Sequence, residues 1–427
     1  MKTNLMMLTS SVFILFFTTF GSAILIASPE KDVLETYSNI AEATYEDSLI
    51  LAKELKETVM VLIAAPTEIN LQLAKKAWIA ARVPYQQTEA YRFGNAIVDD
   101  WEGKVNAWPL DEGLIDYVDF DSYGTESDEN ELYTANVIAN TKLKINGKTV
   151  DSRNISKKFL SEILSEAGGI EANVATGYHA IEFLLWGQDL NGTGPGSGNR
   201  PASDFSISNC SNGNCERRVD YLISVTDLLI DDLEEMVSNW RKNGVARKAL
   251  VNGDPKIGLI SILTGLGSLS YGELAGERMQ LGLMLHEPEE EHDCFSDNTH
   301  NSHYYDLLGM INVYTGHYVR TSGSAVSGTG INELIKAKNS RLNMEMMSKF
   351  HETLFAMTQM KKTAEAGKAY DQMLAVGDKD GNQLIQEVVD RLKDQTRIIE
   401  KLVAELNLNS IEFEGSDSLD DPGKIFK

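Results

Sequence analysis

Hydrophobic residues recur at intervals of three and four along most of the chain. This period is typical of amphipathic helices that bury one face, so the pattern predicts an all-α protein. One short segment differs, since Asn146-Gly147 is typical of the tight turn of a small hairpin. The helical stretches that we expect cover residues 33–45, 71–85, 155–164, 221–240, 331–360 and 384–406.

The first 27 residues do not belong to this pattern. Lys2 is followed by an uncharged, mostly apolar run that ends in small residues near Gly21–Ala23 and Leu25–Ala27. We therefore expect a signal peptide over residues 1–27 and export to the periplasm or cell envelope. The run is also long enough to span a bilayer, so an uncleaved membrane anchor is the alternative.

Charge and cysteine content narrow the function classes further. The net charge of −24 repels nucleic acid, so no nucleic-acid partner is expected. Three cysteines in an exported chain suggest one bridge. Turn residues separate Cys210 from Cys215, so these two are expected to form a disulfide and to leave Cys294 free.

The segment Gly177–Gly187 combines an apolar helix with two polar side chains. Residues three apart share a helix face, so His179 and Glu182 project side by side from an apolar surface. A buried carboxylate needs a compensating partner, such as an arginine, a metal or a hydrogen-bond donor. Gly177 allows close backbone approach at the start of this helix.

Two interpretations of the pair remain open at this point. A histidine with a glutamate one turn later is common as a hydrogen-bonded core pair. The same side chains are also strong ligands for a transition ion, because neutral imidazole and carboxylate suit iron and zinc. The G-x-H-x-x-E spacing is moderately specific and does not separate the two.

Further motifs are spread over most of the chain. Besides G-x-H-x-x-E at 177–182, they are Trp78-x-x-x-Arg82-x-x-Tyr85-x-x-x-Glu89-x-Tyr91-Arg92-Phe93-Gly94, Trp108-Pro109-Leu110-Asp111 with Ile115-Asp116, and the segment 291–300. Together they resemble the imelysin-like family of bacterial envelope proteins, which includes insulin-cleaving peptidases and iron-regulated proteins, and particularly its iron-regulated protein A branch. The resemblance implies two fused helical-bundle-like halves, placed here at residues 28–204 and 205–427, with a site near the motif helix.

The resemblance also implies site residues beyond the motif. Glu89 follows Arg82 by seven residues on the second predicted helix, so both lie on one face. Glu89 would supply a third ligand or a hydrogen-bond partner while Arg82 balances charge, and a paired or solvated charge stripe is the alternative. Asp111, in a proline-stiffened turn, is a further candidate ligand. Trp78 and Gly177 are expected to line the site.

The second half of the chain offers two more candidate regions. Residues 257–285 are rich in glycine and are expected to be broken or tightly packed. Glu273 and Arg278 in this stretch either pair with each other or line the site. Residues 287–303 carry several carboxylates and histidines that could bind a metal, but a polar connecting loop would look the same.

The ligand types favour metal binding over hydrolysis. Common zinc proteases need two histidines four apart with a glutamate between them, and the sequence has no H-E-x-x-H. We therefore expect an exported protein that binds a transition metal ion, iron or alternatively zinc, and takes part in iron acquisition with other envelope iron-uptake proteins. A metallopeptidase, implied by the family name, is one alternative. A helical module that binds a small ligand and has a structural His/Glu pair is another.

Overall fold

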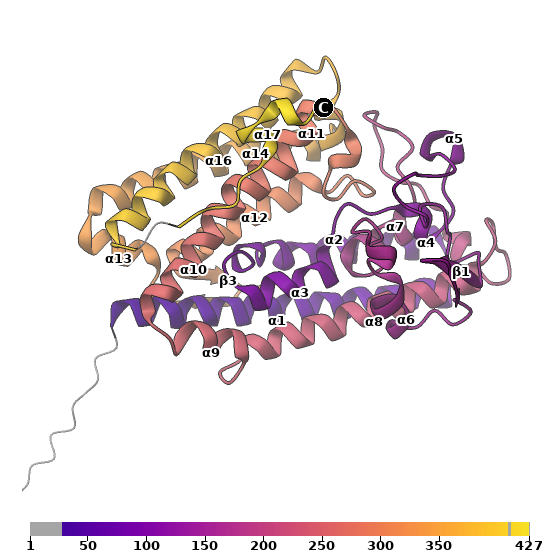
Figure 1. Cartoon of the computed structure of the whole chain (residues 1–427), viewed down its shortest axis with the longest axis horizontal. Coiled ribbons are helices and arrows are strands. Elements are labelled where there is room, and N and C mark those ends of the chain that lie inside the picture. The colour runs from indigo at the N-terminus through magenta and orange to yellow at the C-terminus, as the bar shows by residue number, and fades with distance from the viewer. Residues whose placement is uncertain (1–27, 409–410, 427) are drawn as a thin grey trace, which may run out of the picture.

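Helices dominate the computed structural model, which describes residues 28–408 and 411–426 (Figure 1). The all-α prediction is confirmed, and the signal peptide expected over residues 1–27 lies outside the described residues. The first α-helices are α1 (Pro29–Ala64), α2 (Glu68–Gln86), α3 (Ala96–Asn106), α4 (Glu112–Ile115), α5 (Phe120–Tyr123), α6 (Lys157–Phe159), α7 (Gly177–Trp186), α8 (Cys215–Trp240) and α9 (Val245–Val251). The later ones are α10 (Pro255–Ser268), α11 (Leu281–Leu285), α12 (Thr299–Thr315), α13 (Ile331–Lys338), α14 (Ser340–Glu365), α15 (Tyr370–Leu374), α16 (Lys379–Glu405) and α17 (Asp417–Asp420).

Shorter elements connect these helices. Two antiparallel hairpins are present, and the turn of the first contains Asn146 and Gly147, as the sequence predicts. The strands are β1 (Lys142–Ile145), β2 (Lys148–Asp151), β3 (His317–Val319) and β4 (Ala325–Ser327). The single-turn and π-helical segments are η1 (Glu89–Tyr91), η2 (Leu160–Leu164), η3 (Ala167–Gly169), η4 (Ala202–Phe205), η5 (Leu269–Gln280), η6 (Pro288–Glu290) and η7 (Pro422–Lys424).

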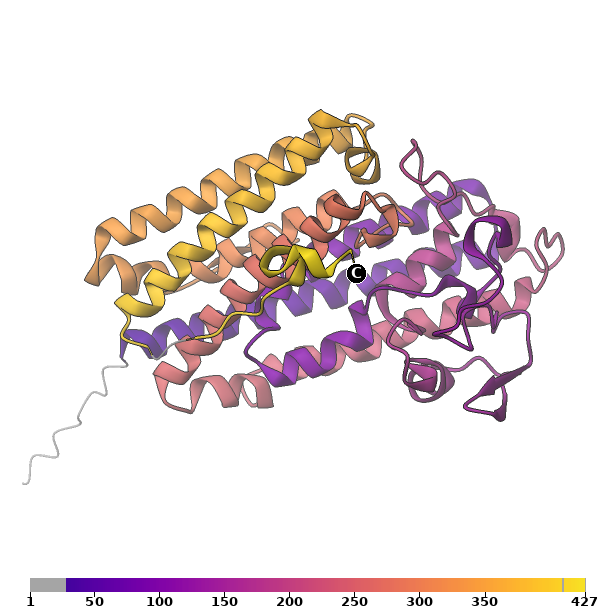
Figure 2. The same cartoon turned by 45° about the horizontal axis from the view of Figure 1, so that its top comes forward.

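The long helices lie in two groups (Figures 1 and 2). Helices α1, α2, α3, α7 and α8 pack on one another in the first group, and α10, η5, α12, α14 and α16 form the second. Helix α12 packs against α2 and η1, and this contact joins the groups. The division of the chain at residue 204 stays a prediction. Helix α8, which follows that residue, packs along α1 and α7.

Side-chain caps fix where several helices begin. The Ser28 side chain accepts a hydrogen bond from the Lys31 amide at the start of α1, and Asp378 accepts one from Gly381 at the start of α16. Asn339 caps α14 through the Leu342 amide, which divides the periodic stretch 331–360 into α13 and α14. The apolar period alone therefore predicts the helical content but not this break.

The second helix covers the expected stretch 71–85 but does not reach Glu89. Helix α2 stops at Gln86, so Arg82 and Glu89 are not on one continuous helix face, and Glu89 begins the separate segment η1. The backbone amide and the hydroxyl of Thr88 both donate to the Tyr85 carbonyl, which tightens the chain into a turn at the end of the helix.

The glycine-rich stretch 255–285 is one tightly packed helical run. It passes from α10 through the π-helical segment η5 into α11. A Cβ atom at Gly265 would lie 2.5 Å from the Ala90 carbonyl oxygen, so glycine here permits close contact with η1. Among the described residues this run alone is long and apolar enough to cross a bilayer, yet 67% of its apolar window is buried, as in a core helix.

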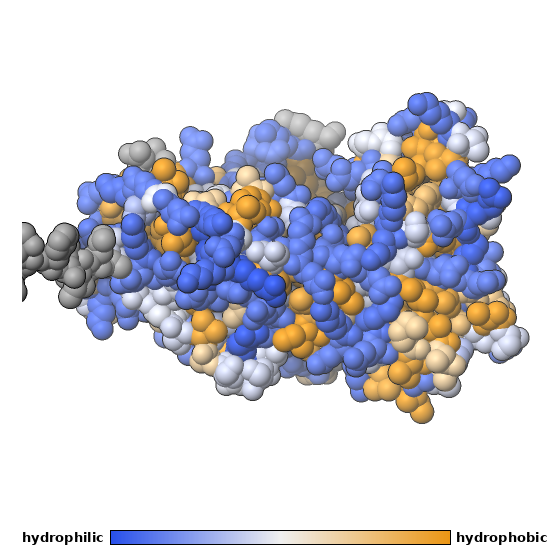
Figure 3. Space-filling view, turned by 90° about the horizontal axis from the view of Figure 1, so that it is seen from below, coloured by the Kyte–Doolittle hydropathy of each residue, from blue (hydrophilic) through white to orange (hydrophobic). Residues whose placement is uncertain are grey.

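The surface is largely hydrophilic, in agreement with the acidic composition. On the face shown in Figure 3, hydrophobic residues gather mainly toward the end at which Figure 1 places β1 and α6.

Candidate functional site

Helix α7 carries the G-x-H-x-x-E motif, and all ten of its residues are buried. It begins at Gly177, whose φ of +78° lies in the left-handed region. A Cβ atom at this position would lie 2.3 Å from the Val105 carbonyl oxygen of α3. Glycine therefore lets α7 start directly against α3, as the sequence predicts for a close backbone approach.

His179 and Glu182 lie side by side in the interior of the protein. Both are fully buried, and His179 Nδ1 is 3.1 Å from Glu182 Oε2. The backbone amide and hydroxyl of Ser296 donate to the other carboxylate oxygen of Glu182, at 3.0 and 2.6 Å. The carboxylate is thus compensated by hydrogen-bond donors from the loop that precedes α12.

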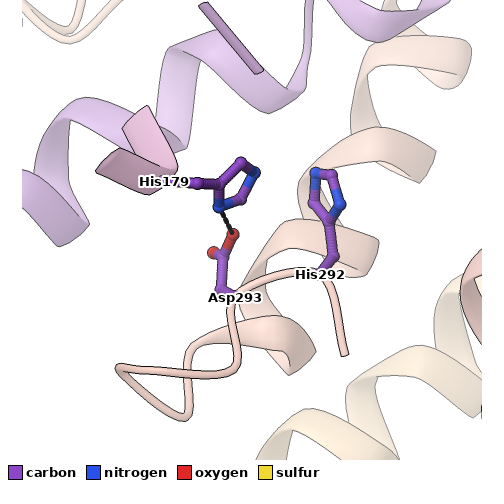
Figure 4. A group of neighbouring side chains, drawn as sticks. All are labelled: His179, His292 and Asp293. Atoms are coloured by element: carbon purple, nitrogen blue, oxygen red, sulfur yellow. Dashed lines mark ion pairs between the residues drawn. The ribbon is translucent and has the colours of Figure 1, made fainter. Parts of the chain in front are cut away.

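That loop also brings His292 and Asp293 to the motif helix (Figure 4). His179 Nδ1 is 4.0 Å from Asp293 Oδ1, and the rings of His179 and His292 lie with their centroids 4.8 Å apart. One potential ligand atom from each of the three residues lies within 4.8 Å of the others. Two imidazoles and one carboxylate, all buried, therefore converge from α7 and the loop.

Arg82 and Asn106 fix this group from the other side. Arg82 donates to Asp293 Oδ1 at 2.7 Å and to Asn106 Oδ1 at 2.6 Å. The Asn106 amide nitrogen donates to Glu102 and lies 3.3 Å from His292 Nε2. The remaining oxygen of Asp293 accepts from Asn298 and Ser302, so its orientation is fully determined.

Burial sets the protonation of these groups. It lowers the pKa of His179 well below 6.5, with the Arg82 charge acting in the same direction, and it lowers the pKa of His292 likewise. Burial alone would raise the pKa of Asp293, but Arg82, His179 and two hydrogen bonds hold it below its usual value. Both imidazoles are therefore neutral at pH 7 beside an ionised Asp293.

Glu182 differs from Asp293 because burial and the neighbouring Asp293 charge raise its pKa well above 4.5. With His179 neutral and Glu182 tending to keep its proton, their contact is a hydrogen bond between uncharged groups rather than an ion pair. Burial therefore has two effects here. It keeps Glu182 protonated, and it keeps the imidazoles of His179 and His292 neutral.

One nitrogen in this group has no partner. His179 Nε2 is buried, and none of the described residues donates to it or accepts from it. A buried polar atom left in this way needs an explanation, such as an ion or a ligand. His292 Nε2 is approached only by the Asn106 amide, which also donates to Glu102 and would keep that hydrogen bond if it moved away from the ring.

Glu89, Glu273 and Arg278 form a neighbouring ion cluster. Arg278 Nη2 lies 2.6 Å from Glu89 Oε2 and 2.7 Å from Glu273 Oε1, and Arg278 Nη1 lies 3.2 Å from Asp306 Oδ2. Glu89 thus pairs with Arg278 and is not a member of the His179 group. Its role as a metal ligand stays a prediction.

A cavity of about 480 Å³ extends from this ion cluster to His292. His292, Asn106, Glu273 and Arg278 line it, and so does Trp108, whose ring centroid is 5.0 Å from that of His179. The cavity gives a route from the surface to the edge of the buried group.

The remaining predicted residues lie in several different places. Trp78 packs on α7, where its indole nitrogen donates to the Tyr178 carbonyl at 2.9 Å. Asp111 accepts a hydrogen bond from Asn130 and lines a different cavity of about 550 Å³, so its role as a ligand also stays a prediction. Cys210 and Cys215 form a disulfide, and Cys294 is a buried free cysteine.

The sequence does not single out Asp293. Residues 287–303 form a region that could bind a metal, and residues 291–300 carry part of the family resemblance, but the sequence does not show which of these side chains would be metal ligands. His292 and Asp293 are adjacent in sequence and more than 100 residues from His179, so only the fold brings them together.

This chain is similar in sequence to a known protein family and to one curated protein. The family model of imelysin matches residues 41–399. Iron-regulated protein A of Synechococcus elongatus is 38% identical over 64 residues, which is 15% of this chain and 18% of that protein. The chain thus matches less than a fifth of that protein's length.

Two solved structures share the fold. The structure of a candidate iron-regulated protein A precursor from Parabacteroides distasonis aligns with a TM-score of 0.62 at 19% identity, covering 88% of this chain and 95% of that one. An imelysin-like protein from Psychrobacter arcticum aligns with a TM-score of 0.60 at 17% identity, covering 90% and 97%. Since the imelysin model matches most of the sequence, the chain belongs to the imelysin family.

Proposed function

We propose that this protein is an exported imelysin-like protein that binds a transition metal ion, iron first and zinc second, at His179, His292 and Asp293, and that it takes part in iron acquisition. The buried convergence of these three side chains within 4.8 Å carries the proposal. Two imidazoles and one carboxylate are the donor set typical of non-haem ferrous sites.

The residues fit an ion in three respects. Both imidazoles are neutral, so each has a lone pair to donate, and Asp293 is ionised. His179 Nε2 has no partner among the described residues. Arg82, Asn298 and Ser302 hold Asp293 in a fixed orientation, which lowers the cost of arranging the ligands. A bound iron ion would supply a redox-active Lewis acid.

Titration calorimetry of the metal-free protein tests this function. We expect binding of about one ferrous ion per chain under anaerobic conditions, and His179→Ala and Asp293→Asn should each weaken it by about a hundredfold or more, because two remaining ligands compete poorly with buffer. His351→Ala is the matched control, since His351 is exposed on α14 and distant in sequence from the group. Zinc and ferric ions are titrated in parallel to rank the metals.

The outcomes separate the alternatives. Unchanged affinity in folded His179→Ala and Asp293→Asn would contradict the proposal, and circular dichroism checks that each variant is folded. If His179→Ala loses its helical signal, the pair is structural, and Asp293→Asn then decides the metal question. Incubation of the same metal-loaded protein with peptides tests the alternative proposal of a metallopeptidase.

A further inference from the structure

A second group of carboxylates lies outside the histidine site. Oxygen atoms of Asp189, Asp297 and Asp371 lie within 4.8 Å of one another. Asp189 follows α7, Asp297 belongs to the loop before α12, and Asp371 lies in α15. Three segments that are distant in sequence therefore present acidic side chains to one point.

Two of these carboxylates, Asp371 and Asp297, have buried oxygen atoms without a hydrogen-bond partner among the described residues. Asp371 is only 2% exposed, and neither of its side-chain oxygens has a hydrogen-bond partner in the described part of the chain. Asp297 Oδ1 is likewise buried without a partner. Burial, followed by the charges of Asp371 and Asp189, raises the pKa of Asp297 to about 7. Buried acids in contact with one another are costly unless a cation or a proton neutralises them.

The donor set selects the cation. All three donors are carboxylate oxygens, which hard divalent ions prefer to the nitrogen and sulfur ligands of later transition metals. Calcium accepts about six to eight oxygen ligands in an irregular arrangement, whereas magnesium demands a near-ideal octahedron, so carboxylates from three separate segments suit calcium better. Asp189 Oδ1 accepts from the Asn191 backbone and side chain, which leaves Oδ2 for an ion.

An acidic cavity reaches one member of this group, Asp189. Asp189 lines the cavity of about 550 Å³ together with four further carboxylates, and no Lys, Arg or His is among its described lining residues. A cavity lined by one sign of charge raises the local concentration of the opposite ion. The other acidic lining residues are Asp111, Glu112, Glu287 and Glu289.

We propose that Asp189, Asp297 and Asp371 bind a calcium ion that cross-links the segment after α7, the loop before α12 and α15. The ion would neutralise the buried Asp371 and complete its coordination with water and backbone carbonyl oxygens. It would hold the loop that carries His292 and Asp293 without contacting either imidazole of the histidine site.

Thermal unfolding of the full chain, freed of metal with a chelator and then given calcium chloride, tests the site. At a calcium concentration a hundred times the dissociation constant, we expect the Tm to rise by about 3–5 °C, because an ion that binds only the folded state stabilises it. Magnesium should raise the Tm less at the same concentration. Calorimetric titration gives the stoichiometry, which should be one calcium ion per chain.

Asp371→Asn and Asp297→Asn should abolish the calcium-dependent rise. Each should leave the ion-free Tm equal or higher, because it removes a like charge from a crowded group, and this separates loss of the site from loss of the fold. Asp390→Asn, an exposed acid on α16, should keep the full rise. His179→Ala should also keep it, since the two sites use different ligands. The proposal is overturned if calcium leaves the parent Tm unchanged or raises it equally in folded Asp371→Asn.

Discussion

Gly177 brings the start of the motif helix directly against the backbone of α3. Substitution by alanine would put a Cβ atom 2.3 Å from the Val105 carbonyl oxygen in a backbone with φ of +78°. We expect Gly177→Ala to lower the free energy of unfolding by about 3 kcal/mol or more, because both strain and overlap oppose the native position of α7. Urea denaturation measures the change, and iron affinity should fall as α7 moves.

Gly103→Ala is the matched control for this prediction. Gly103 lies in α3, and a Cβ atom there would meet nothing within 4 Å. Alanine is the better helix former, so this variant should be more stable than the parent by about 0.5–1 kcal/mol. Equal effects of the two substitutions would mean that the close contact at Gly177 does not constrain α7.

Of the four predicted ligands, only His179 belongs to the group of His179, His292 and Asp293. Three-residue spacing on an apolar helix identified His179 and Glu182, because both are read from local geometry. Arg82 was expected to balance charge, and it does contact the site, through Asp293. His292 and Asp293 were not separable from their acidic loop, since tertiary packing alone decides which loop side chains are buried.

Among the secondary-structure elements, η5, η1 and α12 are joined by the side chain of Arg278. It lies in η5 and pairs with Glu89 of η1 and Asp306 of α12. Arg278→Met would leave Glu89 and Glu273 buried with less positive charge beside them, and we expect a loss of about 3–5 kcal/mol in the free energy of unfolding. The loss should be larger at pH 8 than at pH 5, because burial raises the pKa of Asp306 against the lowering effect of Arg278, and without the arginine this carboxyl is stable at low pH only by keeping its proton.

Arg391→Met on α16 provides the comparison. Arg391 pairs with Glu387 and Glu352 at the surface, where such ion pairs contribute about 1 kcal/mol or less. Urea denaturation at both pH values measures the two variants side by side. A loss for Arg278→Met no larger than that for Arg391→Met would show that the buried cluster does not hold these elements together.

Helix positions followed from apolar periodicity, while several helix ends did not. The period predicted α8 and α16, both of which have a clear buried face. The break at Asn339 depends on a side-chain cap by Asn339, and the separation of Glu89 from α2 depends on a tight turn in which the Thr88 amide and hydroxyl both donate to the Tyr85 carbonyl. Such bonds are weak relative to the periodic signal, so the sequence alone did not locate these ends.

At the scale of the whole molecule, buried acids make stability depend on pH. Burial raises the pKa of Glu102, Asp371, Asp297 and Glu289 to about 7 and that of Asp232 to about 6. Acids whose folded pKa exceeds the unfolded value stabilise the fold at low pH and lose this contribution as pH rises through the folded pKa. Histidines offset only part of this loss, because His300 and His303, with pKa values of about 4 and 3, are neutral in the folded state while an unfolded imidazole is about half protonated at pH 6.5.

We therefore expect the free energy of unfolding, measured in chelator, to fall by about 1–2 kcal/mol between pH 6.5 and pH 8. Chemical denaturation at several pH values measures this slope. Glu102→Gln keeps an amide oxygen for Asn106 and should make the slope shallower. A stability that stays level or rises over this interval would contradict the assignment of raised pKa values to these acids.

The loop before α12 supplies ligands to both candidate ion sites, His292 and Asp293 to one and Asp297 to the other. Two ligands that bias the same segment are thermodynamically linked, and the linkage is reciprocal. If calcium ordering of the loop tightens iron binding by some factor, iron must tighten calcium binding by the same factor. In that case the calcium concentration around the protein would shift the iron concentration at which the proposed histidine site fills.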